Sequence, residues 1–348
     1  MPSNAVGRLP TVLLVASLAA GGQATEPAVP ASPAPSTGDG AAIGLVMPSA
    51  AARPAAETRD GSLDSAVLAS AGGDAAWIAA ADRQFGLRIY ALDGDEVSAF
   101  GVGRLNSVDA IAVADDQYVL AASNASANAL SLFTASIDDG VLTVSTLNPI
   151  ALTMTAPAGL CMERMGDRLG VYVADRTGQL EEWHIDASGN GVLSRTMTFA
   201  GQTRACVVDR SRRTLYVADD AAGIWSLDLA SGELKLVDGR AEQKLLPGAA
   251  CLGIHASPDG DYLVASGSAG RGVGVYALPA GEAEAAFRVN PNAELGIDGM
   301  PVVSGVTAFG KALPAYPEGI VIVHDGSGNE RSFKLVDWRA IRTLIESR

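Results

Sequence analysis

One phrase of the sequence recurs six times: an apolar run, a small or acidic hinge, and a second apolar run. The copies start at residues 76, 117, 169, 214, 261 and 319, at intervals of about 41 to 58 residues. Their runs are rich in Val, Ile, Tyr and Trp and are separated by turn residues, which indicates short strands. Repeats of this size in strand-forming sequence are typical of propellers and solenoids.

The length of the repeat region favours the propeller. Residues 61–348 divide into six units of just under about 50 residues, which is room for four strands and their turns. We therefore predict an all-β fold, a six-bladed β-propeller of four-stranded antiparallel blades. A seventh blade would need a copy of the phrase that the sequence does not contain.

A fainter pattern precedes each copy, in the order variable residue, small residue, apolar residue. The innermost strand of a propeller blade lines the central channel, so the variable residues are expected to form a ring around the axis, where a ligand can bind. The predicted channel ring is Asp64, Asp109, Ala158, Arg204, Ala250 and Asp298.

The N-terminal residues indicate export. Residues 1–24 contain Arg8, an apolar stretch from 9 to 20 and a small-residue end at Ala24, which is the layout of a signal peptide. The stretch is too short to span a bilayer, so we expect no integral membrane segment after cleavage and a secreted or periplasmic protein. Residues 25–60 are rich in Pro, Ala and Gly and are predicted to be a linker, with the propeller domain at 61–348.

The charge of the chain limits its partners. A net charge of −14 repels polyphosphate backbones unless positive side chains are gathered in one place or a cation intervenes, so nucleic acid is not expected as a partner. Three cysteines, Cys161, Cys206 and Cys251, leave at least one thiol unpaired. We interpret them as buried thiols that pack as small hydrophobes.

The acidic hinges allow two interpretations. Asp175, Asp219 and Asp325 each follow the first apolar run of a copy, and Asp220 extends one of these hinges. Carboxylates that converge from several loops suit a calcium ion, which prefers oxygen ligands. Alternatively, an Asp at the end of a strand accepts hydrogen bonds from its own turn. The pattern alone favours the turn.

Several motifs together resemble the β-propeller phytases. They are "VGRLNSVD" (102–109), "APAGLCM" (156–162), "GQLEEW" (178–183), "LYVADDAAGIW" (215–225), "IDGM" (297–300), "YPEGIVIVHDG" (316–326) and "FKLVDW" (333–338). The resemblance covers residues 60–340. It implies a six-bladed propeller that binds calcium ions at the mouth of its channel and hydrolyses myo-inositol hexakisphosphate (phytate) there. It further implies Asp64, Asp219, Asp220 and Asp298 as metal ligands and Arg83 and Arg176 as phosphate-binding residues. Catalytic residues are not assigned.

The chain departs from this family at the ring. The family carries Asp, Asp, Tyr, Glu, Glu and Asp, whereas Ala158, Arg204 and Ala250 stand at the third, fourth and fifth positions here. Arg204 repels a divalent ion about 5 Å away by roughly 6 to 7 kcal/mol at an effective dielectric constant near 20. Retention of calcium is therefore doubtful. Leu63 and Ile111 also replace a family acid and a family arginine.

Two functions follow from these departures. The first is a weak calcium-dependent phosphomonoesterase of the phytase type. The second is a non-catalytic propeller that binds phytate or another phosphorylated ligand directly through Arg83, Arg176 and Arg204, or that assists a separate catalytic partner. In both cases we expect a monomer.

Overall fold

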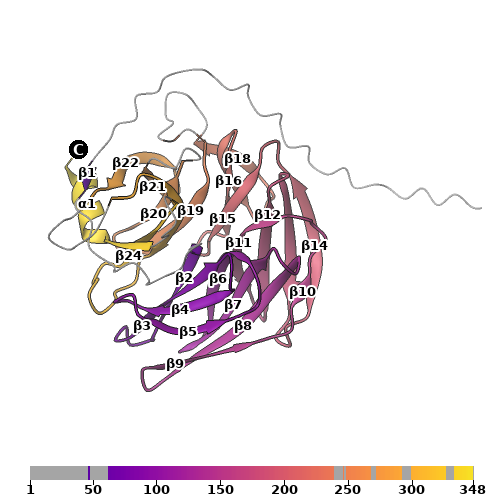
Figure 1. Ribbon diagram of the computed structural model, residues 1–348. Helices are drawn as coiled ribbons and strands as arrows, with labels where there is room; N and C mark the ends of the chain where they lie inside the picture. The colour runs from indigo at the N-terminus through magenta and orange to yellow at the C-terminus, as the bar shows by residue number, and fades with distance from the viewer. Residues whose placement is uncertain are drawn as a thin grey trace, which may run out of the picture.

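The computed structural model describes residues 46–47, 62–238, 246, 248–267, 272–291, 299–326 and 333–347. Six sheets of antiparallel blade strands form a ring, which is a six-bladed β-propeller (Figure 1). The predicted all-β fold and the number of blades are confirmed.

Blades 1 to 3 occupy the N-terminal half of the ring. Blade 1 contains β2 (Ser62–Ala69), β3 (Ala76–Asp82), β4 (Leu87–Ala91) and β5 (Glu96–Phe100). Blade 2 contains β6 (Leu105–Ala114), β7 (Gln117–Asn124), β8 (Ala129–Asp138) and β9 (Val141–Thr146), and the short β10 (Ile150–Ala151) also pairs with β8. Blade 3 contains β11 (Pro157–Met165), β12 (Arg168–Asp175), β13 (Gln179–Ile185) and β14 (Gly191–Thr198).

Blades 4 to 6 complete the ring. Blade 4 contains β15 (Thr203–Asp209), β16 (Thr214–Asp219), β17 (Gly223–Asp228) and β18 (Leu234–Asp238). Blade 5 contains β19 (Cys251–Ser257), β20 (Gly260–Ser266), β21 (Val273–Ala277) and β22 (Glu282–Val289). In the described part of blade 6 there are three strands, β23 (Val303–Phe309), β24 (Ile320–Asp325) and β25 (Phe333–Asp337), followed by helix α1 (Trp338–Glu346).

The N-terminal segment also contributes to a blade. Strand β1 (Val46–Met47) pairs in parallel with the outer strand β22, at residues Arg288 and Val289. This pair lies within residues 25–60, which were predicted to be a linker. The signal peptide predicted at 1–24 lies outside the described residues.

The repeated phrase corresponds to the second and third strands of each blade, and its hinge is the turn between them. The Asp175 carboxylate accepts hydrogen bonds from the backbone N–H groups of Thr177 and Gln179, at 2.8 Å each. Asp219 accepts in the same way from Ala221 and Ala222, at 2.9 and 3.0 Å. Both carboxylates are buried. The acidic hinge therefore satisfies the backbone of a tight turn, as the turn interpretation predicts.

The hydrophobic core lies between the blades. The described residues form six clusters of buried side chains, and each cluster combines residues from two neighbouring blades. In one of them Ile78 and Tyr90 of blade 1 pack against Ile320 and Phe333 of blade 6, which closes the ring between the first blade and the last. The runs of Val, Ile and Ala in the sequence are thus buried on both faces of the sheets.

Helix α1 covers the edge of blades 5 and 6. Asp337 caps it by accepting a hydrogen bond from the backbone N–H of Arg339, and Trp338 and Ile341 are buried against the sheets. The Trp338 ring stacks on the ring of His255 in β19, with 3.5 Å between the centroids. Among the described residues, no helix has the length and apolar character needed to cross a membrane.

Candidate anion-binding site at the mouth of the channel

The innermost strands surround a central channel. Strands β2, β6, β11, β15 and β19 follow one another around the centre of the ring (Figure 1). Strand β23 closes the circle, because it contacts both β19 and β2. The channel contains two cavities of about 340 Å³ each. Asp64, Cys206 and Leu252 line both, so these residues mark the waist between the two cavities. We call the cavity that contains Arg204 the mouth cavity and the other the lower cavity.

Three arginines of the described part of the chain line the mouth cavity. Arg83 and Arg176 come directly after the hinge aspartates of blades 1 and 3, and Arg204 lies on β15. The Arg204 guanidinium donates to the side-chain oxygen of Gln202 at 3.2 Å and lies 3.5 Å from the Asp220 carboxylate. Its side chain is 43% exposed, so it faces solvent at the opening. The structure therefore brings the three predicted phosphate-binding residues to one cavity.

The residue after the hinge is a position that the predicted ring did not include. Gly267 and Gly326 follow the second strands of blades 5 and 6, and they line the mouth cavity together with Arg83 and Arg176. In blade 4 this position is Asp220. The repeated phrase could have indicated this second set of channel residues, because the residue after the hinge occupies the same place in each copy.

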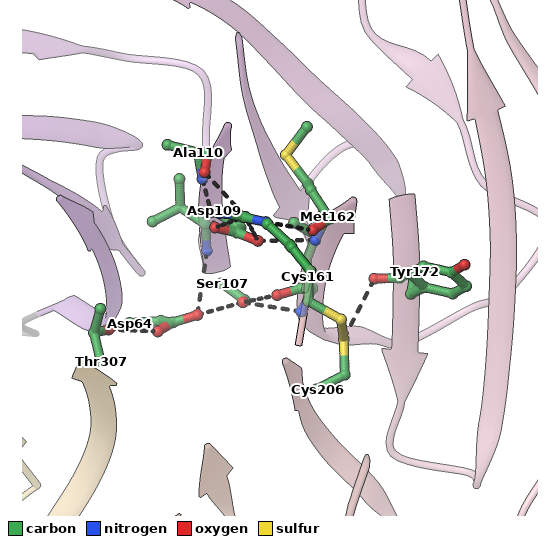
Figure 2. Close-up of polar contacts among 12 residues, drawn as sticks. Asp64, Ser107, Asp109, Ala110, Cys161, Met162, Tyr172, Cys206 and Thr307 are labelled. Atoms are coloured by element: carbon green, nitrogen blue, oxygen red, sulfur yellow. Dashed lines mark hydrogen bonds and ion pairs between the residues drawn. A yellow bond between two sulfur atoms is a disulfide. The ribbon is translucent and has the colours of Figure 1, made fainter. Parts of the chain in front are cut away.

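Asp64 lies at the waist and has neutral hydrogen-bond partners. The Ser107 hydroxyl donates to its carboxylate, the Ser65 backbone N–H donates at 2.9 Å, and the Thr307 hydroxyl lies 3.4 Å away (Figure 2). Burial raises the pKa of Asp64 to about 7, and the nearby charge of Asp109 acts in the same direction. These contacts hold the carboxylate against the wall of the channel.

Asp109 does not lie level with Asp64, contrary to the predicted ring. In blade 1 Asp64 pairs with Ala81, one residue before the end of β3. The equivalent pair in blade 2 is Ser107 with Ser123, so Ser107 is level with Asp64, and Asp109 lies two residues further along β6. Asp109 lines the lower cavity, where it forms an ion pair with Arg210 at 3.0 Å. A shift of two residues keeps a side chain on the same face of a strand, and the alternating pattern therefore did not reveal it.

Arg204 is also displaced by a bulge. The pairing of β15 with β16 shifts between Thr203 and Ala205, and Ala205 is the residue level with Asp64. Ala158 and Ala250 line the mouth cavity. Asp298 and the side chain of Leu63 lie outside the described residues. The predicted ring positions that the structure describes thus do not all lie at one level along the channel.

The described residues do not fit a calcium cluster. Among them, no three side chains of His, Cys, Asp or Glu are grouped so that they could bind one metal ion. The Asp219 carboxylate already accepts hydrogen bonds from the backbone of its own turn and from the indole N–H of Trp225, the latter at 3.3 Å. Asp109 forms an ion pair with Arg210. Asp220 accepts from the backbone N–H of Gln202 and faces a guanidinium.

A disulfide joins the channel walls of blades 3 and 4. Cys161 on β11 and Cys206 on β15 are bonded through their sulfur atoms (Figure 2). Cys251 is a free thiol, and burial raises the pKa of this thiol to about 11. The interpretation of all three cysteines as thiols is therefore wrong for the first two. The repeat places Cys161 and Cys206 on adjacent inner strands, 45 residues apart.

Comparisons with known proteins agree with the motifs. The chain is 26% identical over 289 residues to the 3-phytase of Bacillus subtilis (strain 168), which covers 75% of this chain and 74% of that protein. It also matches the fold of a structural genomics protein of unknown function from Bacteroides thetaiotaomicron, with a TM-score of 0.52, 12% identity, and coverage of 78% of this chain and 68% of the other. The sequence profile of the Phytase family matches residues 19–348. The chain therefore belongs to the phytase family.

Proposed function

We propose that this protein is an exported, monomeric phytase-family propeller that binds a phosphorylated small molecule directly through arginines, without a calcium cluster. The observation that carries the proposal is the meeting of Arg83, Arg176 and Arg204 at one cavity whose described residues lack a metal-binding group of carboxylates. Guanidinium groups bind phosphate oxygens in pairs of charge-assisted hydrogen bonds, and these do not need a bridging cation.

Arg83, Arg176 and Arg204, which we call the arginine rim of the mouth cavity, supply the binding energy in this proposal. The backbones of Arg83 and Arg176 belong to turns that the preceding aspartates fix, so the turns need little ordering when a ligand binds. Arg204 has a weak partner in Asp220 at 3.5 Å, which a phosphate can replace. The chain as a whole is acidic, so three arginines that line one cavity gather positive charge against the net charge of the protein.

Calorimetry with phosphate esters tests the proposal. Binding is expected to be unchanged by a chelator, and Arg176→Gln is expected to weaken it by about tenfold, the usual effect of losing a charge-assisted hydrogen bond. Arg195→Gln is the matched control, because Arg195 lies on the outer strand β14 and pairs with Glu182. Binding that disappears in chelator, or that Arg176→Gln leaves unchanged, would refute direct binding by arginine.

A second candidate is calcium-dependent hydrolysis of phytate, which membership of the phytase family favours. It predicts phosphate release from phytate with calcium and none with chelator. The double variant Arg204→Glu, Ala250→Glu removes the cation and adds acids beside the mouth cavity. If the altered ring is what prevents the reaction, this variant gains calcium-dependent release; no calcium-dependent release in either protein counts against the second candidate.

A further inference from the structure

A groove lies between blades 5 and 6 at the lower end of the propeller, opposite the mouth. Strand β19 runs from Cys251, which lines the mouth cavity, down to the β19–β20 turn, which forms one wall of this groove. The connection between β23 and β24 and one side of α1 form the other walls, and the groove has a volume of about 460 Å³. Its lining includes two aromatic side chains and two exposed prolines, Tyr262, Trp338, Pro258 and Pro317. We call it the α1 groove.

The walls of the α1 groove are fixed by contacts within the protein. The ring centroid of Trp338 lies 3.5 Å from that of His255 and 5.3 Å from that of Tyr262. Arg342 of α1 donates to both carboxylate oxygens of Glu318, at 2.7 and 2.8 Å, which holds the helix against blade 6. Grooves with aromatic walls of this kind bind polyproline II segments, which lose little conformational freedom on binding.

The chain has a proline-rich segment in front of β1. Residues 27–35 read PAVPASPAP, with proline at every third position from 27 to 33. A polyproline II helix has three residues per turn, so in that conformation these prolines lie along one face. The sequence thus supplies the kind of segment that the α1 groove suits.

The direction of β1 leads this segment toward the α1 groove. β1 runs parallel to β22, with Val46 level with Arg288, and β22 runs from the lower end of blade 5 to its mouth end. A chain that enters β1 in this direction approaches from the lower end, where the groove lies. From Arg288 to Tyr262 the sheet extends about 20 Å along the strands and about 10 Å across them. The extended chain from Pro35 to Val46 spans up to about 36 Å, so the segment reaches the groove.

The charges of the segment and the groove are complementary. Glu26 is the one charged residue between positions 25 and 38 of the sequence. Lys311 lines the α1 groove, is exposed, and forms no ion pair with any residue that the structure describes. Glu26 stands directly before the first proline, so a segment that lies in the groove can place its carboxylate near this ammonium group.

We infer that the α1 groove binds the chain's own proline-rich segment, residues 27–35, as a polyproline II helix. The prolines at every third position pack against the aromatic and proline side chains of the groove, and Glu26 pairs with Lys311. This contact joins the N-terminal segment to blades 5 and 6 at the end of the channel opposite the proposed phosphate site. The inference is independent of the proposed function.

Fluorescence anisotropy with a labelled peptide of residues 25–37 tests the inference on the full-length protein. In the wild type the chain's own segment competes with the peptide at an effective concentration of about 1 mM. A variant with Pro27→Ser, Pro30→Ser and Pro33→Ser leaves the groove open. For a Kd of about 100 μM, the peptide is expected to bind this triple variant about tenfold more tightly than the wild type. A peptide with the same three substitutions is the control and binds neither protein.

A charge swap locates the binding site. Lys311→Glu, added to the triple variant, is expected to weaken peptide binding about threefold, and a peptide with Glu26→Lys restores it. A merely structural effect of the substitution would not be restored by the altered peptide. Lys235→Glu, at an exposed position on β18 of blade 4, is the matched control and leaves the affinity unchanged.

Three results would overturn the inference. Equal binding of the peptide to the wild type and the triple variant would show a groove that is open to another proline-rich chain. Binding to neither protein would show that the groove does not take such a segment. Wild-type protein that blocks the peptide only as a dimer in sedimentation would place the segment in the groove of a second copy.

Discussion

His255 links the stability of the propeller to pH. Its side chain is fully buried in β19, its ring stacks on Trp338, and its Nε2–H donates to the backbone carbonyl of Glu318 at 2.7 Å. Burial lowers the pKa of His255 from 6.5 to about 4, although the hydrogen bond to Glu318 and the charge of Asp261 oppose the shift. The folded protein therefore keeps this imidazole neutral.

The sign and size of the effect follow from proton linkage. Between pH 6.5 and 4 the unfolded chain binds a proton at His255 and the folded chain does not, so acid favours unfolding. The free energy of unfolding contributed by this residue is expected to fall by about 2 kcal/mol on going from pH 7 to 5, and by about 3 kcal/mol at pH 4. The contribution is fully present above pH 6.5.

Urea unfolding of the wild type and of His255→Gln across this pH range measures the effect. The difference in unfolding free energy between the two proteins removes the contributions of the other titrating groups. We expect the wild type to lose about 3 kcal/mol relative to the variant between pH 7 and 4. His184→Gln, on the partly exposed β13 position, controls for the loss of any histidine. A His255 difference that stays constant within about 0.5 kcal/mol over this range would refute the reasoning.

Two further predictions concern the inner strands. Replacing Cys161 and Cys206 by serine is expected to lower the free energy of unfolding by about 4 kcal/mol, because the disulfide closes a loop of 45 residues in the unfolded chain. Scanning calorimetry measures this change, and a loss below about 1 kcal/mol would contradict the prediction. Gly159→Ala is expected to cost about 1 to 3 kcal/mol, since the added Cβ would lie 2.5 Å from the Cα of Ala205 on the neighbouring strand. Gly72→Ala, where the nearest atom is a side-chain oxygen at 3.4 Å, is the control, and equal melting temperatures for the two variants would contradict the second prediction.

The repeat and its strand-forming runs were sufficient to predict the architecture. A sheet with buried side chains on both faces needs another sheet against each face. Six copies of one unit meet this need for every blade only when the last blade packs against the first, as Ile320 does against Ile78. The predicted mouth arginines are also found together, because Arg83 and Arg176 occupy one position in the repeat and repetition around an axis brings equivalent positions to one side.

The levels of the channel residues were decided by the tertiary structure alone. The bulges in β2, β6 and β15 and the two-residue shift of Asp109 change the depth of a side chain without changing the face on which it lies. The hydrophobic pattern indicates on which face of a strand a side chain lies, but not how deep in the channel that side chain lies. For the same reason the sequence showed three cysteines but not which of them meet, since that depends on how adjacent inner strands are aligned across the channel.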